Sequence, residues 1–333
     1  MQTRNFGRLG TVSALTLGGG GIAGVWGSTG RGEAIATVHA AIDAGITMLD
    51  VAPSYGAGYE SEQVVGAALR ERPAPDVLIT SKVQPPDGRD VAGSYVAGRD
   101  VAGSIDRSLH ASLRRIGREH LDLLLLHKQI RPADESAAAP DTVGWRTYRE
   151  EVVPALERLR AAGQIRAWGI TAVGHPDAVL SALGEDALGE DARPDAAQVV
   201  VNALDLSGDM WVFGPDVPPA NEEILRTANA HGVPVLGIRV VAAGSLTSAV
   251  DRDVTGQPAG ADYARAESFR KLAAELGESP AALAHRYALS VAGVASVILG
   301  VKNRTELDEC VAAEARGPLT ETELRAISAL RAP

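Results

Sequence analysis

The sequence predicts a single (β/α)8 barrel, the TIM barrel, with a short N-terminal hairpin before it and extra helices at its C-terminal end. Short apolar segments alternate with amphipathic helical segments along the chain, about eight of each, as is typical of parallel α/β folds. The apolar segments are continuous runs, as expected for strands that are buried on both faces. No change of composition marks a boundary, so residues 1–333 are predicted to form one domain.

The predicted strands are short runs rich in Val, Ile and Leu, and they cover residues 14–17, 46–50, 77–81, 121–126, 167–170, 197–201, 235–238 and 294–299. Residues 6–9, closed by Gly7 and Gly10, are predicted to form the hairpin or a loose N-terminal cover. Helical spacing of apolar residues predicts helices over residues 33–45, 61–69, 99–116, 150–162, 176–183, 222–230, 263–276, 280–289, 305–315 and 320–330. Gly45 is predicted to end the first helix, and Ser61 and Ser279 are predicted N-caps.

One long loop and two short repeats are predicted to lie outside the core. Residues 128–144 are predicted to be a loop. Two short repeats, residues 90–94 with 100–104 and residues 182–186 with 187–191, are predicted to be surface-loop expansions, because their periods are too short for a solenoid.

The composition is that of a globular protein, with 45% apolar and 22% charged residues among 333. The net charge of −10 argues against nucleic acid or an anionic membrane as a partner. Cys310 is the only cysteine, so no internal disulfide is possible. The N-terminus lacks an apolar leader, and no run reaches the ~18 apolar residues of a membrane span. A cytoplasmic protein is therefore expected; the oligomeric state is not indicated.

A run of glycines competes with the barrel interpretation. Residues 19–24 match the dinucleotide fingerprint G-x-G-x-x-G, and Asp43 lies near the distance expected for a ribose contact. That fingerprint requires a helix to begin inside the motif, whereas the helical pattern begins only near Glu33. Each interior glycine costs a helix about 1 kcal/mol relative to alanine, so no helix is expected there. The glycines are instead predicted to let the first βα loop, at Gly20, pass close to a ligand.

Three predicted strands end in an ionisable side chain. Asp50, Lys82 and His127 stand at or just past the ends of strands 46–50, 77–81 and 121–126, and Tyr55 lies in the loop after Asp50. In a parallel barrel these ends converge on the face where catalytic residues lie. Each of the three, taken singly, is equally well explained as a structural ion pair or a capped strand end. Their joint spacing with Tyr55 favours a catalytic site.

These residue types suit proton transfer to a carbonyl oxygen during hydride transfer. Free tyrosine titrates near pH ~10, and an adjacent ammonium, here Lys82, favours the phenolate and lowers that pKa. Asp50 would hold Lys82, and His127 would orient the substrate oxygen against Tyr55. The sequence has neither metal-ligand spacing nor a serine nucleophile elbow, so no metal site and no hydrolysis are expected.

The same residues resemble the aldo-keto reductase family. The resemblance extends over nearly the whole chain and is carried by segments 45–56 (GITMLDVAPSYG), 61–69 (SEQVVGAAL), 79–82 (ITSK), 108–116 (SLHASLRRI), 121–127 (LDLLLLH) and the Gly300 segment. It implies a (β/α)8 barrel that binds NAD or NADP at the C-terminal rim without a Rossmann domain. It also implies Tyr55 as the general acid/base, assisted by Lys82, Asp50 and His127.

The resemblance also implies a set of cofactor contacts. Gln198 matches the glutamine that binds the nicotinamide carboxamide, Thr171 stands where the family usually has serine, and Arg239 replaces the usual stacking aromatic residue. The loop with Gly244 and Leu246 would pass the pyrophosphate. The adenosine end would be clamped by the segment that holds Gly300, Lys302, Arg304, Glu306, Glu309 and Cys310. Glu306, where many NADPH-preferring members have arginine, gives a slight preference for NAD.

The substrate is expected to be a small polar carbonyl or alcohol compound. The chain most resembles the bacterial branch with aldose and pyridoxal dehydrogenases, which implies a sugar-like substrate. Candidate pocket residues are Trp26, Tyr59, Lys128 and Trp211, for which ordinary loop packing, or a solvated side chain at Lys128, is the alternative. Two other functions stay open: a broad aldehyde or ketone reductase, and a non-catalytic regulatory protein that binds NAD(P).

Overall fold

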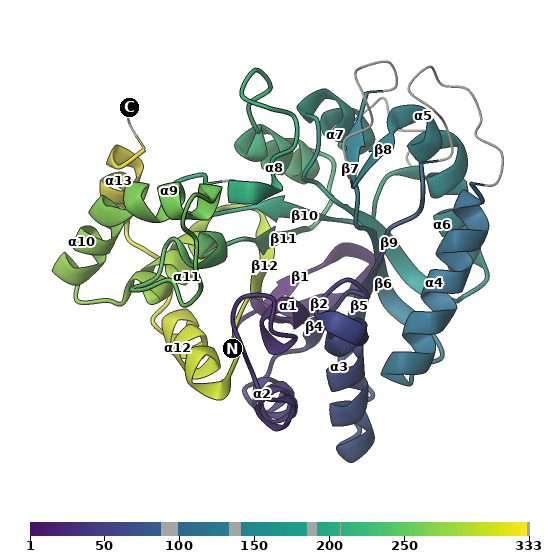
Figure 1. The fold of residues 1–333 in the computed structure, drawn as a ribbon, viewed down its shortest axis with the longest axis horizontal. Helices are drawn as coiled ribbons and strands as arrows, with labels where there is room; N and C mark the ends of the chain where they lie inside the picture. The colour runs from purple at the N-terminus through teal and green to yellow at the C-terminus, as the bar shows by residue number, and fades with distance from the viewer. Residues whose placement is uncertain (88–98, 133–140, 185–191, 207, 332–333) are drawn as a thin grey trace.

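A closed barrel of eight parallel strands forms the centre of the computed structural model, which describes residues 1–87, 99–132, 141–184, 192–206 and 208–331 (Figure 1). The (β/α)8 fold class is confirmed. In sequence order the barrel strands are β3 (Leu15–Gly18), β4 (Met48–Asp50), β5 (Leu78–Val83), β6 (Leu121–Leu126), β9 (Ile165–Thr171), β10 (Ala196–Val200), β11 (Val235–Ile238) and β12 (Val294–Leu299). Parallel pairing of β12 with β3 closes the barrel.

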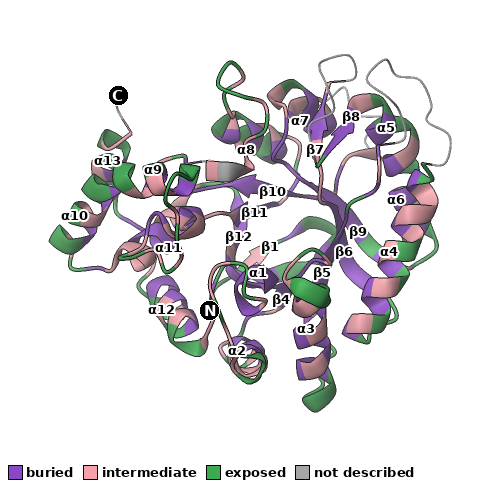
Figure 2. Cartoon of the chain, in the orientation of Figure 1, coloured by how far each residue is buried: buried purple, intermediate pink, exposed green. Residues whose placement is uncertain are grey.

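Helices surround the barrel and turn their apolar faces to it, so that buried residues concentrate on the strands and the inner helix faces (Figure 2). They are α2 (Arg31–Asp43), α3 (Glu60–Glu71), α4 (Val101–Ile116), α6 (Val153–Ala161), α7 (Pro176–Leu183), α8 (Asn221–Ala230), α11 (Pro280–Ser290), α12 (Arg304–Ala315) and α13 (Glu321–Ala329). The caps at Gly45 and Ser279 are as predicted: Gly45 has φ +87°, and the Ser279 side chain accepts from the Ala282 N–H.

The N-terminal hairpin, β1 (Thr3–Asn5) and β2 (Thr11–Ser13), is confirmed and covers the amino end of the barrel. Its buried apolar side chains pack in one cluster with side chains of the barrel interior; the cluster contains Phe6, Leu9, Val12, Met48, Leu123, Leu125 and Leu236. Arg4 fixes the hairpin to the far end of the sequence, donating to the carbonyl oxygens of Val294 at 2.7 Å and Leu289 at 2.9 Å.

Several predicted boundaries differ from the structure. Residues 263–276 form two helices, α9 (Pro258–Arg265) and α10 (Glu267–Glu275). The helix predicted to begin at residue 150 begins earlier, with α5 (Trp145–Thr147) and a π-helical turn, Tyr148–Val152, before α6. The repeat copies at residues 90–94 and 187–191 lie outside the described residues, whereas 100–104 caps and begins α4 instead of forming a loop.

The predicted loop 128–144 contains a two-stranded parallel sheet, β7 (Gln129–Arg131) and β8 (Thr142–Gly144). Each strand has three residues, too few to give a periodic signal. The buried Asp87 carboxylate attaches this sheet to the barrel, because it pairs with Arg131 and accepts hydrogen bonds from Thr147 Oγ1 at 2.6 Å and the Gly144 N–H at 3.3 Å.

The prediction that no helix begins in the glycine run is wrong, because a single helical turn, α1 (Gly19–Ile22), forms there. The closed barrel nevertheless excludes the Rossmann fold. The glycines allow close packing: a Cβ at position 21 would lie 2.1 Å from the carbonyl oxygen of Val301, and one at position 18 would lie 2.3 Å from that of Leu299. The chain at this point therefore fits against the end of β12 and the loop after it only because positions 18 and 21 carry no side chain.

Ser61 is not an N-cap, which corrects a second prediction. Helix α3 begins at Glu60, after Tyr59 in the left-handed region with φ +65°, and no side chain caps it. Ser61 is fully buried in the first turn. There its hydroxyl oxygen is so close to Gly19 that a Cβ at that position would lie 2.1 Å away.

Glu62 connects three elements through a buried carboxylate. It is fully buried, and it accepts hydrogen bonds from Ser81 Oγ at 2.7 Å and Arg115 Nε at 2.5 Å. Glu62→Ala would leave the guanidinium, whose side chain is 18% exposed, without its partner, and we expect the free energy of unfolding to fall by about 3 kcal/mol. Urea unfolding measures this. Glu71→Ala, at an exposed site on the same helix, is the matched control and should stay near the wild-type midpoint.

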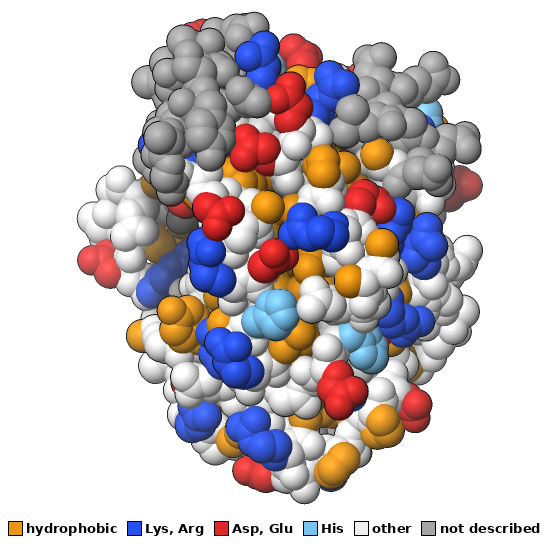
Figure 3. Space-filling model, turned by 90° about the vertical axis from the view of Figure 1, so that its right-hand side faces the viewer, with side chains coloured by type: hydrophobic (Ala, Val, Ile, Leu, Met, Phe, Trp, Pro, Cys, Tyr) orange, Lys and Arg blue, Asp and Glu red, His pale blue; other side chains and the backbone are white. Residues whose placement is uncertain are grey.

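The outer face on the α4 and α6 side carries basic and acidic side chains interspersed (Figure 3). Arg158 of α6 and Asp106 of α4 form one such pair at 2.9 Å. Within the described residues, no helix is both long enough and apolar enough to cross a bilayer.

Candidate active site

Four proton-handling side chains meet at the carboxyl ends of β4, β5 and β6. Asp50 ends β4, Lys82 is the second-last residue of β5, His127 follows β6, and Tyr55 lies in the loop after β4. Lys82 Nζ lies 2.6 Å from Asp50 Oδ2 and 4.6 Å from the centre of the Tyr55 ring. The Tyr55 and His127 rings meet edge to face at 5.5 Å. The structure thus brings together the four residues that the sequence analysis selected.

Hydrogen bonds from two sides of the barrel fix this group. Lys82 is fully buried and donates to Asp50 and also to the carbonyl oxygen of Val51, at 3.0 Å. Gln198, from β10 on the opposite side of the barrel, donates through Nε2 to Asp50 Oδ1 at 2.8 Å. Both Asp50 oxygens are therefore engaged, and the Lys82 ammonium is held beneath the Tyr55 ring.

Burial and the attraction between Lys82 and its neighbours together set the pKa values of the site. Burial alone would lower the pKa of Lys82, but attraction to Asp50 and Tyr55 outweighs it and raises the pKa above its usual value. Burial raises the pKa of Asp50, against the attraction of Lys82. Burial also raises the pKa of Tyr55, although the charge of Lys82 acts in the opposite direction. The prediction that Lys82 lowers the net pKa of this phenol is therefore wrong; only the sign of that single interaction was right.

His127 is neutral at physiological pH. Burial, and then repulsion from Lys82, lowers its pKa to about 3. Its Nδ1 lies 3.4 Å from Ser54 Oγ, which is within hydrogen-bond distance. A neutral imidazole beside Tyr55 can offer one N–H donor to an oxygen atom without competing for a proton.

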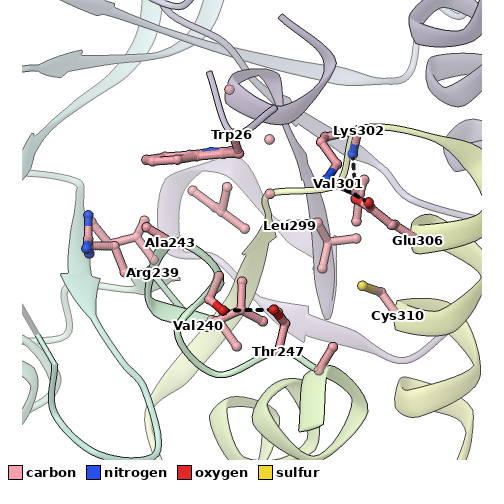
Figure 4. A pocket seen from close by; sticks show the side chains of 18 of the residues that line it. Trp26, Arg239, Val240, Ala243, Thr247, Leu299, Val301, Lys302, Glu306 and Cys310 are labelled. Atoms are coloured by element: carbon pink, nitrogen blue, oxygen red, sulfur yellow. Dashed lines mark hydrogen bonds and ion pairs between the residues drawn. The ribbon is translucent and has the colours of Figure 1, made fainter. Parts of the chain in front are cut away.

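A cavity of about 450 Å³ extends from Tyr55 and His127 to the N-terminal part of α12. Its walls contain Asp50 and most of the predicted cofactor residues: Gly20, Thr171, Gln198, Arg239, Gly244, Gly300, Lys302, Glu306, Glu309 and Cys310. Trp26, a predicted substrate residue, also lines it. Figure 4 shows Arg239 at one end, Trp26 along one side, and Lys302, Glu306 and Cys310 at the other end.

Two predicted cofactor residues do not line the cavity. Leu246 is fully buried in the core beneath the loop that follows β11. Arg304 points outward from the start of α12, where its guanidinium pairs with Glu33 at 2.9 Å. Neither side chain belongs to the wall of the cavity.

Three predicted substrate residues also lie outside the cavity. Tyr59 is half exposed and lies under the guanidinium of Arg115 at 4.1 Å. Trp211 packs on Phe213 with ring centres 5.3 Å apart. Lys128, at a bend directly after His127, is not among the residues that line the cavity.

The sequence analysis missed several lining residues, which include Met210, Thr247, Ser248, Asp251, Arg252 and His285. Most come from the loops after β10 and β11, where no periodic pattern exists. Backbone strain marks the second of these loops, because Arg239, Ala242 and Ala243 have φ of +55°, +47° and +53°. Strained backbone of this kind is common at ligand-binding sites, but the amino-acid types of the loop do not predict it.

Carboxylates surround the one lysine at the α12 end of the cavity. Lys302 Nζ pairs with Asp251. It also lies 3.1 Å from Glu306 Oε1 (Figure 4). Glu306 also accepts a hydrogen bond from the Lys302 backbone N–H at 2.9 Å. The described residues hold no cluster of three or more His, Cys, Asp or Glu side chains suited to a metal ion.

Known proteins resemble this chain in sequence and in structure. Aldo-keto reductase YhdN from Bacillus subtilis is 32% identical over 48% of this chain and 43% of its own length. D-threo-aldose 1-dehydrogenase from a Pseudomonas species is 30% identical over 48% of this chain and 50% of its own. Pyridoxal 4-dehydrogenase from Microbacterium luteolum is 30% identical over 51% and 55%. The chain thus matches about half the length of these relatives.

The whole fold has solved counterparts. Aldo-keto reductase AKR11C1 from Bacillus halodurans, in its holo form, superimposes with a TM-score of 0.71 over 100% of this chain and 97% of its own, at 24% identity. An aldo-keto reductase from Klebsiella pneumoniae in complex with NADPH gives 0.67 over 100% and 96%, at 22% identity. At these identities the likeness concerns the fold alone. The model of the aldo/keto reductase family matches residues 14–332, and the chain therefore belongs to that family.

Proposed function

We propose that the protein is an NAD(P)-dependent oxidoreductase that moves a hydride between the nicotinamide and the carbonyl or alcohol carbon of a small polar substrate. The observation that carries this proposal is the convergence of Tyr55, Lys82, Asp50 and His127 at one end of a long cavity. Family membership supports the reaction type.

The cavity suits a dinucleotide. Its volume of about 450 Å³ lies within the usual range for ligand pockets, ~300–1,000 Å³. At the Tyr55 end, Gln198 donates its NH₂ to Asp50, which leaves its amide oxygen to accept from a carboxamide. At the other end, carboxylates of Glu306 and Glu309 line the wall and suit ribose hydroxyl groups. Gly20 and Gly300 line the cavity beside Trp26, where side chains would narrow the passage.

The bound cofactor would supply or accept the hydride; the protein handles the proton. Tyr55, kept protonated by its raised pKa, donates to the substrate oxygen during reduction. Lys82 stabilises the phenolate that results, and Asp50 holds Lys82 in place. His127, neutral, donates a hydrogen bond that positions the same oxygen. In the oxidative direction Tyr55 accepts the proton.

A sugar-like substrate is our first candidate. Relatives named D-threo-aldose 1-dehydrogenase and 6-dehydroglucose reductase support it, at 30% and 31% identity over 48% and 41% of the chain. A general aldehyde reductase is the second candidate, supported by a relative named methylglyoxal reductase YeaE, 34% identical over 44% of the chain. The intact set of four residues argues against the non-catalytic alternative.

The test is hydride transfer measured by NADH absorbance with a panel of aldoses, their lactones and simple aldehydes. We expect turnover with at least one substrate. Sugars should outperform simple aldehydes in kcat/KM if the first candidate is right, and the reverse order would favour the second. Binding of NADH without turnover across the whole panel would support the regulatory alternative.

We expect NADH to bind more tightly than NADPH, by about tenfold. A 2′-phosphate next to Lys302 would also meet Glu306 and Asp251, which already share the lysine charge, and like charges repel. A 2′-hydroxyl can instead donate to a carboxylate. Glu306→Gln should improve NADPH binding and narrow the ratio, while Asp308→Asn, at an exposed position of the same helix, should leave it unchanged. Fluorescence titration measures both constants; tenfold tighter NADPH binding would contradict the preference.

A further inference from the structure

The position of the ring proton decides what His127 can do in the site. The backbone N–H of His127 donates to the carbonyl oxygen of Val83 at 2.8 Å, and the ring meets Tyr55 edge to face at 5.5 Å, so the residue is held on both counts. Its pKa lies far below physiological pH, and the neutral ring therefore has a single N–H. That proton is on Nδ1 or on Nε2, and the hydrogen bond made by one nitrogen decides which of them carries it.

The two ring nitrogens of His127 have different surroundings. Nδ1 lies 3.4 Å from Ser54 Oγ, and Ser54 does not line the cavity. The His127 ring does line the cavity, which leaves Nε2 as the nitrogen that a ligand can reach. Among the residues that the structure describes, Ser54 is the one hydrogen-bond partner of the ring.

Ser54 stands in a turn that directs its side chain to His127. It follows Pro53, whose ring restricts the backbone at that point. The next residue closes the turn, because the Tyr55 N–H donates to the carbonyl oxygen of Ala52 at 3.1 Å. The Ser54 hydroxyl is exposed and makes no second hydrogen bond within the described part of the chain, so its O–H is available to Nδ1.

We propose that Ser54 is a positioning residue: its hydroxyl donates to Nδ1 of His127 and so keeps the ring proton on Nε2, where it faces the substrate oxygen. This inference rests on the proposed function. A carbonyl oxygen only accepts hydrogen bonds, so Nε2 must carry the N–H that orients it. With the proton on Nδ1, the lone pair of Nε2 would instead meet the lone pairs of the carbonyl oxygen and repel them.

The first test observes the ring proton directly on the full-length protein. Histidine is isotope-labelled at its ring nitrogens, and the NMR signals of His127 are identified by their absence in His127→Gln. We expect a pyrrole-type Nε2 and a pyridine-type Nδ1 in the wild type. In Ser54→Ala only water can donate to Nδ1, so the two signals should move toward each other as the two tautomers mix.

Steady-state kinetics measure what the tautomer contributes to the reaction. In Ser54→Ala, kcat for carbonyl reduction should fall about 3- to 10-fold, the usual effect of losing one hydrogen bond, while NADH binds as in the wild type. Ser54→Thr keeps the hydroxyl and should retain most of the rate. Ser54→Val has nearly the same shape without the hydroxyl, and it should lose as much as Ser54→Ala.

Two further variants separate this role from a structural one. In the His127→Gln background, Ser54→Ala should have no additional effect on kcat, because Ser54 acts through the ring. Ser328→Ala removes a hydroxyl from an exposed position of α13 and should match the wild type in the spectra and in the kinetics.

Three results would overturn the inference: His127 signals that do not change in Ser54→Ala, mixed tautomers with a wild-type kcat, or a loss of kcat of the same size in the His127→Gln background, which would mean that Ser54 only maintains the loop. Failure of the proposed function would look different. Signals that respond to Ser54→Ala in a protein without hydride transfer to any substrate would refute the oxidoreductase and keep the contact between Ser54 and the ring. Turnover with signals that do not respond would keep the oxidoreductase and reject the role of Ser54.

Discussion

Tyr55→Phe is expected to lower kcat for carbonyl reduction by about 1,000-fold, within the range of general acid catalysis, while NADH binds as in the wild type. The substitution removes one oxygen atom, the proton donor, and keeps the ring that packs edge to face on His127 and over Lys82. Stopped-flow measurement of NADH oxidation, together with a fluorescence titration of NADH, separates the chemical step from binding.

The pH dependence tests the same role. The pKa of Tyr55 is raised above its usual ~10, so the phenol stays protonated and the reduction rate should be flat from about pH 6 to 9. Oxidation requires the phenolate and should rise with pH over that range. Because the pKa of His127 is lowered to about 3, no inflection is expected near the ordinary histidine value of ~6.5.

His120→Ala is the matched control, since this exposed histidine lies just before β6 at the opposite end of the strand from His127. Its kinetics and its pH profile should equal those of the wild type. A Tyr55→Phe variant that keeps more than a tenth of the wild-type kcat would remove Tyr55 from the mechanism.

Lys82→Met is expected to have the second large effect, on both rate and stability. It leaves the Asp50 carboxylate buried with only the Gln198 donor, and breaking a buried pair in this way costs about 3–5 kcal/mol in the free energy of unfolding. It also removes the charge that stabilises the Tyr55 phenolate, so kcat should fall at least about 100-fold. Urea unfolding and steady-state kinetics measure the two effects.

The double variant Asp50→Asn/Lys82→Met separates stability from catalysis. It replaces the ion pair with two neutral side chains of similar size, so most of the stability should return, because no buried charge is left without a partner. The rate should not return, since Tyr55 still lacks the ammonium. A double variant as unstable as Lys82→Met would contradict the stabilising role proposed for the ion pair. A double variant that regains activity would contradict the proposed role of Lys82 in catalysis.

Much of the fold follows from local sequence patterns. The apolar run that becomes β6 is long enough to be recognised, and its buried end fixes where His127 appears. Asp50 likewise ends the apolar run that becomes β4. The three-residue strands β7 and β8 give no such signal, because their pairing depends on Asp87, which is distant in sequence. Secondary structure built on tertiary contacts of this kind cannot be read from local patterns.

The residues of the candidate site also divide into those that local sequence patterns predict and those that depend on tertiary structure. Side chains at strand ends are placed by the barrel and could be predicted, whereas Arg252 and Asp251 reach the cavity through an irregular loop whose backbone conformation no pattern encodes. The net pKa of Tyr55 was also beyond prediction. It depends on how much water the folded loops exclude, and a sequence shows which charges are neighbours but not how deeply they are buried.

The attachment of Arg4 to Leu289 and Val294 has a consequence for biosynthesis. During translation the hairpin leaves the ribosome long before β12 has been made, so the nascent chain carries the apolar side chains of Phe6, Leu9 and Val12 without their final support. Strand β3 likewise cannot pair on this side until β12, its partner in the closed barrel, has been synthesised. The last strand of the barrel thus completes the first part of the chain, and a product terminated before β12 would present an open sheet edge to chaperones and proteases.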